Sequence, residues 1–124
     1  MKSWKSIRRG DREAMGSRKI RYDKLVRDKI PEIIEADGKK AEIMLLGDDD
    51  YRKCLDEKLG EELKEYLESG SVEELADLVE VIYALVGLNG LSREEFENIR
   101  ASKEENRGGF RKRLFLKEVI IDSD

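Results

Sequence analysis

The middle of the chain alternates apolar and polar positions with the period of an α-helix. Between residues 50 and 68 the apolar side chains recur every three or four residues and so share one helical face: Leu55, Leu59, Leu63 and Tyr66. Residues 72–88 are nearly all apolar, and Ser69-Gly70-Ser71 lies between the two runs. The pattern predicts two helices joined by a tight turn, the second ending at Asn89-Gly90.

Local signals predict further helices on either side of this hairpin. Pro31 is favourable in a first helical turn, and we expect a short helix over residues 32–37 that Gly38 ends. Asp48-Asp49-Asp50 supplies an N-cap and negative charge for the helix over residues 50–68. Ser92-Arg93-Glu94-Glu95 is a capping box that opens another helix, which should end at Gly108-Gly109.

The fold class that these elements predict is all-α, a helical hairpin bundle. Residues 40–46 and 113–121 are compact and apolar, so a short two-stranded β element between them is an additional expectation. Residues 1–19 have few apolar positions and no clear period, which favours a flexible basic extension. The folded domain is therefore expected over residues 20–121.

Charge is distributed unevenly along the chain, although the net charge is only −4. Residues 1–30 contain 11 Lys and Arg against 4 Asp and Glu, residues 31–97 contain 7 against 20, and residues 98–124 contain 7 against 5. An acidic centre with basic flanks suits a metal-bound polyanion, because acids hold the cation while Lys and Arg meet phosphate. A solvated acidic helix pair with a basic tail explains the same charges.

The rarest residue types exclude several kinds of chemistry. The chain has no histidine, which removes Ser–His and Cys–His catalysis and the usual zinc sites. Cys54 is the only cysteine, so no internal disulfide forms, which fits a reducing compartment. No run approaches the roughly 20 apolar residues of a membrane span, and the N-terminus lacks a signal-peptide core. We therefore expect a soluble, cytoplasmic protein whose metal, if any, has oxygen ligands.

Four carboxylates are predicted to face one another across the turn. Glu62 and Glu65 are spaced by three residues on the first helix, as are Glu74 and Asp77 on the second. Measured from Gly70, the two pairs lie at heights that match to within about 1.5 Å. Such a set of like charges needs a cation, and Mg²⁺ fits best, with Mn²⁺ as an alternative. For Glu61, Glu68 and Glu73 an ordinary solvated position is the simpler interpretation.

Asp77 gives a separate argument, because it lies inside the apolar run 75–88. That helix should be buried on most sides, and an ionised carboxylate buried there costs several kcal/mol without a partner. A metal ion is one such partner. An arginine that pairs with Asp77 is the other.

Two basic segments could contact phosphate. Lys24, Arg27 and Lys29 precede the helix that Pro31 begins, and Lys103, Asn106 and Arg107 precede the pair Gly108-Gly109. Arginine matches phosphate through its planar fork, and glycine allows close approach of the backbone. Surface charge and an ordinary helix end explain the same residues without a ligand.

Taken together, the segments resemble the all-α nucleoside triphosphate pyrophosphohydrolases. The resemblance is greatest to the MazG-like and phosphoribosyl-ATP-pyrophosphohydrolase-like house-cleaning branch, and it covers about residues 20–119. It is carried by four segments: YDKLVRDKIPEIIEADGKK (22–40), KLGEELKEYLE (58–68), EELADLVEVIYAL (73–85) and KEENRGGFRKRLFLKEV (103–119). The connection between the two acidic motifs is shorter here than in many relatives.

This resemblance implies an activity and roles for particular residues. It implies hydrolysis of a nucleoside triphosphate, in house-cleaning of non-standard nucleotides, to a monophosphate and pyrophosphate by a homodimer or larger homo-oligomer. Glu62, Glu65, Glu74 and Asp77 would bind metal, and Glu61 or Glu65 would take the proton of the attacking water. Lys24, Arg27, Lys29, Lys103, Asn106 and Arg107 would bind the substrate.

Three other functions are compatible with the sequence. A phosphoribosyl-ATP pyrophosphohydrolase of histidine biosynthesis would share the fold and the chemistry. A non-catalytic helical binding module would keep the fold alone, although retention of all four acids argues against it. Binding of nucleic acid through the basic arm is less favoured, because Asp11 and Glu13 dilute its charge.

Overall fold

The computed structural model describes residues 18–123, and the order of its helices follows the sequence pattern closely. The helices are α1 (Ile30–Ala36), α2 (Asp48–Ser69), α3 (Val72–Leu88) and α4 (Arg93–Arg107). Within the described residues the architecture is all-α, as predicted. The predicted flexible extension lies outside this range except for its last two residues.

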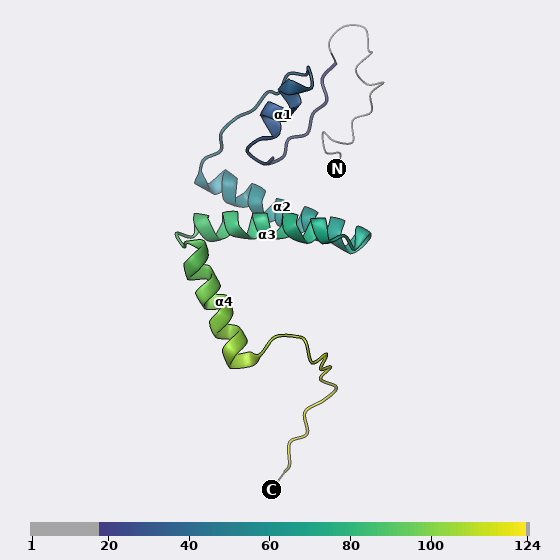
Figure 1. Ribbon diagram of the computed structural model, residues 1–124, viewed down its shortest axis with the longest axis vertical. Coiled ribbons are helices and arrows are strands. Elements are labelled where there is room, and N and C mark those ends of the chain that lie inside the picture. Colours follow the sequence, from purple (N-terminus) through teal and green to yellow (C-terminus); the bar gives the residue numbers. More distant parts are fainter. Residues whose placement is uncertain (1–17, 124) are drawn as a thin grey trace.

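The hairpin of α2 and α3 is the centre of the fold. The two helices lie side by side along most of their length (Figure 1). Gly70 ends α2 in the left-handed conformation, with φ +66°, and its N–H donates to the Tyr66 carbonyl at 2.7 Å. The Ser71 hydroxyl then caps α3 by accepting from the Glu73 N–H at 3.2 Å. Two successive caps thus set a sharp reversal at the predicted turn.

Helix starts agree with the sequence signals in one case and differ in another. The capping box at Ser92 is confirmed: the Ser92 hydroxyl accepts from the Glu95 N–H, and the Glu95 carboxylate accepts from the Ser92 N–H. The prediction that Asp48, Asp49 and Asp50 supply the N-cap of α2 is wrong. Gly47 holds that position, and the three aspartates form the first helical turn, where their charge favours the helix dipole.

The predicted two-stranded β element is wrong for the residues that the structure describes. Residues 40–46 connect α1 to α2, whereas residues 113–121 follow α4 (Figure 1), and neither segment is in a strand. Leu116 and Ile120 are 77% and 81% exposed. β-Propensity describes how well a segment fits a sheet, and it does not supply a neighbouring strand.

The core of the described chain is small. Leu55 of α2 and Val81 and Val86 of α3 are its buried hydrophobic residues. At the junction with α4, Arg93 lies over the Tyr83 ring at 4.3 Å, and Phe96 meets that ring edge-on. The expectation that α3 is buried on most sides is wrong, since Val79 is 42% exposed. Only one face of α3 packs against α2, and α4 contacts its C-terminal end.

Within residues 18–123 no single helix combines the length and apolar character needed to cross a bilayer. The segments α3 and α4 meet that requirement only when taken together, across a bend of 109°.

Candidate metal centre

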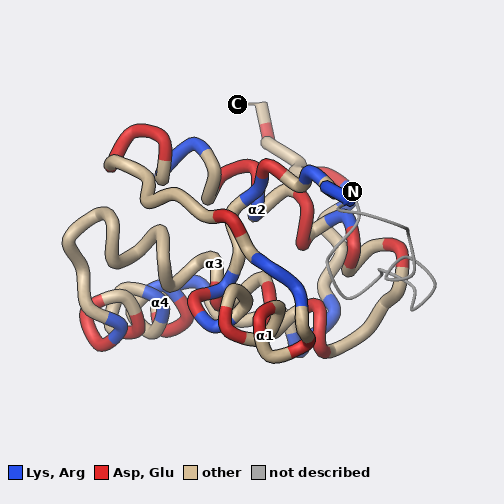
Figure 2. The backbone as a smooth tube through the Cα atoms, turned by 90° about the horizontal axis from the view of Figure 1, so that it is seen from above, with Lys and Arg blue, Asp and Glu red and all other residues tan. Residues whose placement is uncertain are grey.

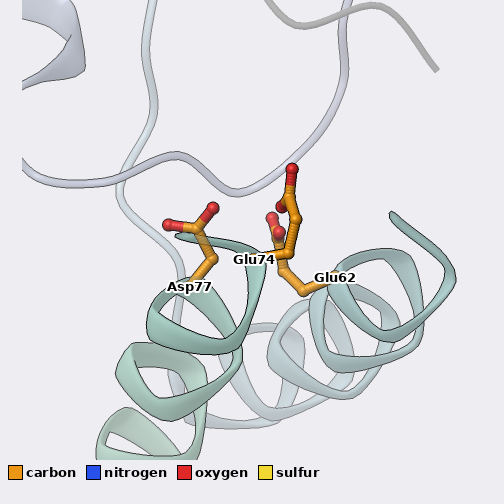
Figure 3. A group of neighbouring side chains, drawn as sticks. All are labelled: Glu62, Glu74 and Asp77. Atoms are coloured by element: carbon orange, nitrogen blue, oxygen red, sulfur yellow. The ribbon is translucent and has the colours of Figure 1, made fainter. Parts of the chain in front are cut away.

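Three carboxylates meet across the hairpin, between about one and two helical turns from its tip at Gly70. Glu62 of α2 and Glu74 and Asp77 of α3 each offer an oxygen atom, and these oxygens all lie within 4.8 Å of one another (Figure 3). Glu62 and Asp77 lie at matching heights measured from Gly70, because both helices rise by about 1.5 Å per residue from the same turn. Glu74 lies one helical turn nearer to Gly70, on the same face of α3 as Asp77. The structure thus brings together three of the four acids proposed as metal ligands.

Glu62 is the buried member of this group. Its side chain is 7% exposed, and Lys58, one helical turn earlier, approaches one carboxylate oxygen at 3.3 Å. The other oxygen is buried without a hydrogen-bond partner among the described residues, and the same is true of one Glu74 oxygen. Burial raises the pKa of Glu62, with a further rise from Glu65, and the Lys58 ammonium only partly offsets this.

Glu65, the fourth proposed ligand, lies beside the group rather than within it. Its carboxyl contributes to raising the pKa of Glu62 and to lowering that of Glu74, so it lies close to both. The pKa of Glu74 is nevertheless raised, first by desolvation and then by the charges of Asp77 and Glu62. Four acids therefore share one region, and repulsion between their charges helps to raise the pKa of Glu62 and that of Glu74.

Asp77 differs from its sequence-based description. Its side chain is 39% exposed, so it is not the buried charge of the group, and Arg27 donates to its Oδ1 at 2.6 Å. Of the two partners expected for Asp77, a metal ion or an arginine, the structure shows the arginine. The reason is that the open face of α3 carries Asp77, and the segment before α1 passes over that face.

Residues 24–29, which we name the strap, place positive charge against the acids. Lys24 is 11% exposed and donates to Glu61 at 3.0 Å, and Lys58 reaches the other Glu61 oxygen at 3.7 Å. With Arg27 on Asp77, each acidic helix of the hairpin is paired with the strap. More widely, Lys and Arg positions lie among Asp and Glu positions along the helices (Figure 2).

A pocket adjoins the acids and runs along the hairpin. Its volume is about 420 Å³. The strap forms one wall through residues 25–29, which include Lys29, and Glu62 and Asp77 lie in its lining. Its other lining residues extend away from the turn along both helices: Tyr51, Leu55, Lys58, Glu80, Val81 and Ala84.

Sequence reasoning missed most of this lining. Lys58 had a usable signal, because it lies four residues before Glu62 on the same helical face. Tyr51, Val81 and Ala84 read as ordinary apolar positions, and nothing in their spacing distinguishes a pocket from a packed core.

The second group of proposed substrate ligands lies elsewhere. Lys103, Asn106 and Arg107 are exposed near the end of α4, which turns away from the hairpin (Figure 1). Gly108 ends that helix with φ +84°, and its N–H donates to the Glu104 carbonyl at 2.7 Å. Gly108 thus acts as a helix end, and the structure does not bring these three residues to the acids.

Comparison with known proteins adds one short similarity. No family model matches the chain, and no solved structure matches it. A protein of Mycolicibacterium smegmatis, described as an uncharacterized protein, is 54% identical over 41 residues. This stretch is 33% of the present chain and 42% of that protein's length.

Proposed function

We propose that this chain is a magnesium-dependent nucleoside triphosphate pyrophosphohydrolase, which converts a triphosphate and water to a monophosphate and pyrophosphate. The observation that carries the proposal is the buried Glu62 oxygen, which lacks a hydrogen-bond partner among the described residues and lies in the same group as Glu74 and Asp77. Leaving such a group unpaired costs free energy, and a divalent cation would supply the partner. Mg²⁺ suits a few carboxylates plus substrate phosphates, and Mn²⁺ could replace it.

The acids divide into ligands and a proton acceptor. When bound, Mg²⁺ neutralises phosphate charge and lowers the pKa of a water molecule. Glu62, Glu74 and Asp77 would hold the ion. Two lysines hold the Glu61 carboxylate, so of the two proposed bases we favour Glu65, which lies beside Glu62 and Glu74 and has no ion pair within the described residues.

The strap supports phosphate binding on the same face. Arg27 pairs with Asp77, and its planar guanidinium can bind a phosphate in place of that carboxylate with the same geometry. Lys24 and Lys29 add positive charge within the same segment. Lys103, Asn106 and Arg107 would contribute only where another copy of the chain, or a movement of α4, brings them to the phosphates.

We further propose that the active form is a homodimer or larger homo-oligomer in the cytoplasm. Large apolar side chains are exposed on the hairpin and on the tail, among them Leu67 at 71% and Phe115 at 86%. Residues 18–123 bury few hydrophobic side chains, so the chain gains stability when copies cover such surfaces. The free thiol of Cys54 fits a reducing compartment.

The test is a panel of nucleotides with Mg²⁺, including non-standard bases and phosphoribosyl-ATP, in which released pyrophosphate is measured. Glu62→Gln and Asp77→Asn remove one charge each from the acid group. Glu68→Gln is the matched control, because Glu68 is exposed on the same helix as Glu62 and outside the group. Direct titration with Mg²⁺ alone measures metal binding without any substrate.

We expect both site variants to lose at least about a hundredfold in kcat/KM, equivalent to roughly 2.7 kcal/mol, while the control stays within about twofold. Unchanged release in both site variants would refute the assigned site. A wild-type protein that binds no Mg²⁺ and splits no nucleotide would favour the non-catalytic binding module instead. Turnover of phosphoribosyl-ATP alone would place the enzyme in histidine biosynthesis.

A further inference from the structure

The groove between α2 and α3 continues beyond the acids, and the pocket of about 420 Å³ occupies this continuation. On α3 its lining passes from Asp77 to Glu80 and Val81 and then to Ala84. These positions are spaced by three or four residues, so they form one stripe that is about 10 Å long. The volume falls within the range of roughly 300–1,000 Å³ that small-molecule sites occupy.

The two ends of this pocket differ in chemistry. At one end lie the acids Glu62 and Asp77, the latter paired with Arg27. The pocket lining has four further charged side chains: Asp28, Lys29, Lys58 and Glu80. At the other end Tyr51 and Ala84 contribute an aromatic ring and a small apolar side chain. A nucleotide has the same polarity, with charged phosphates at one end and a flat base at the other, which aromatic side chains bind by stacking.

We propose that this pocket holds the nucleoside of the substrate, with its base between Tyr51 and Ala84 and its sugar beside Glu80. The inference rests on the proposed function for the position of the phosphates at the acids. Glu80 lies one helical turn past Asp77 and one turn before Ala84, which is the level of the sugar between phosphate and base. A carboxylate accepts hydrogen bonds from sugar hydroxyls, as acidic residues do in dinucleotide-binding folds.

The position of the Glu80 carboxylate beside the proposed sugar predicts which sugar the substrate contains. Its carboxylate has no hydrogen bond or ion pair within residues 18–123, so its acceptor sites are free for a ligand. A ribose offers one more hydroxyl donor than a deoxyribose. The enzyme should favour ribonucleotides over the matching deoxyribonucleotides.

The experiment fills the base end of the pocket while leaving the acids intact. Ala84→Leu adds volume inside the pocket, and Ala76→Leu makes the same change at an exposed position of α3 outside it. Tyr51→Ala removes the ring and serves as a second variant if Ala84→Leu does not fold. The measurements are KM and kcat for nucleotides, the same constants for inorganic tripolyphosphate, and calorimetric binding of nucleoside monophosphates without metal.

We expect Ala84→Leu to raise KM for nucleotides, and to weaken monophosphate binding, by at least about tenfold. Mg²⁺ affinity and any tripolyphosphate hydrolysis should stay within about twofold of wild type, and Ala76→Leu should match wild type throughout. Glu80→Ala should lower the ratio of kcat/KM for ribonucleotide over deoxyribonucleotide by about fivefold or more.

The outcomes separate this inference from the proposed function. A wild type that hydrolyses nucleotides, with unchanged KM in both Ala84→Leu and Tyr51→Ala, would overturn the nucleoside pocket alone. An equal loss on tripolyphosphate would overturn it too, because that substrate has no nucleoside. Failure of wild type to bind Mg²⁺ or split any nucleotide would count against the proposed function, whereas metal-free monophosphate binding that Ala84→Leu abolishes would still support the pocket.

Discussion

Arg27 is the group whose removal tests the metal centre most directly. Its guanidinium donates to Asp77 at 2.6 Å and so occupies a carboxylate that we assign to the metal. An incoming Mg²⁺ competes with this cation for the same oxygen atoms. The variant Arg27→Ala should therefore bind Mg²⁺ alone more tightly than wild type, although it loses a group that we assign to phosphate binding.

The exposure of the pair limits the size of this effect. The side chains of Arg27 and Asp77 are 56% and 39% exposed, so solvent screens their attraction. Ion pairs of this kind contribute about 0–1 kcal/mol. The roughly 0.2–1 kcal/mol typical of measurable exposed pairs converts to a fall of about 1.4- to fivefold in the Mg²⁺ dissociation constant of Arg27→Ala, since 1.4 kcal/mol corresponds to a factor of about ten.

Calorimetric titration with Mg²⁺ at low and high salt measures this effect. Arg21→Ala is the control, because Arg21 belongs to the same region, is 85% exposed and lies 3.8 Å from Asp23 rather than near the acids. It removes an equal charge and should change Mg²⁺ affinity less. The gain in Arg27→Ala should shrink at high salt. Weaker or unchanged Mg²⁺ binding at low salt, or an equal gain in the control, would refute competition at Asp77.

Three further predictions concern pH and stability. The pKa of Glu62 is raised in the folded chain, so the metal-free protein should lose stability as pH rises from the ordinary glutamate value near 4.5 through the folded value. The increase in melting temperature on adding Mg²⁺ should therefore be larger at pH 8 than at pH 5, and Glu62→Gln should remove most of that difference. A larger increase at pH 5 would contradict the assignment of Glu62 as a metal ligand. Gly70→Ala places a side chain at φ +66° and should lower the free energy of unfolding by about 1–2 kcal/mol. Gly60→Ala is the control inside α2, where nothing lies within 4 Å of the added carbon, and it should raise the free energy of unfolding by about 0.5–1 kcal/mol. Equal urea midpoints for these two glycine variants would show that Gly70 does not set the turn. Ser92→Ala removes the hydroxyl that caps α4 and should cost about 1 kcal/mol in urea unfolding, and no change would mean that the capping box contributes nothing to stability.

The sequence determined the helices and the relation between the two acidic motifs. A helical period, a left-handed glycine and a capping serine are local properties, because each depends on residues within about one turn of helix. That is why the ends of α3 and the capping box at Ser92 follow from the sequence. The approach of Glu62 to Asp77 also follows, because two helices that rise equally from one turn match in height, and Glu74 shares the face of α3 that carries Asp77.

The tertiary structure decided which acid is buried and which cation pairs with it. The apolar run around Asp77 suggested burial there, but Glu62 is the buried carboxylate, because the face of α2 that carries it packs on α3 while Asp77 lies at the open side. The pairs Lys24–Glu61 and Arg27–Asp77 join residues 37 and 50 positions apart. The direction of α4 and the absence of strand pairing between residues 40–46 and 113–121 were likewise decided by the tertiary structure. Contacts so distant along the chain depend on how whole elements pack, and no local period or propensity specifies them.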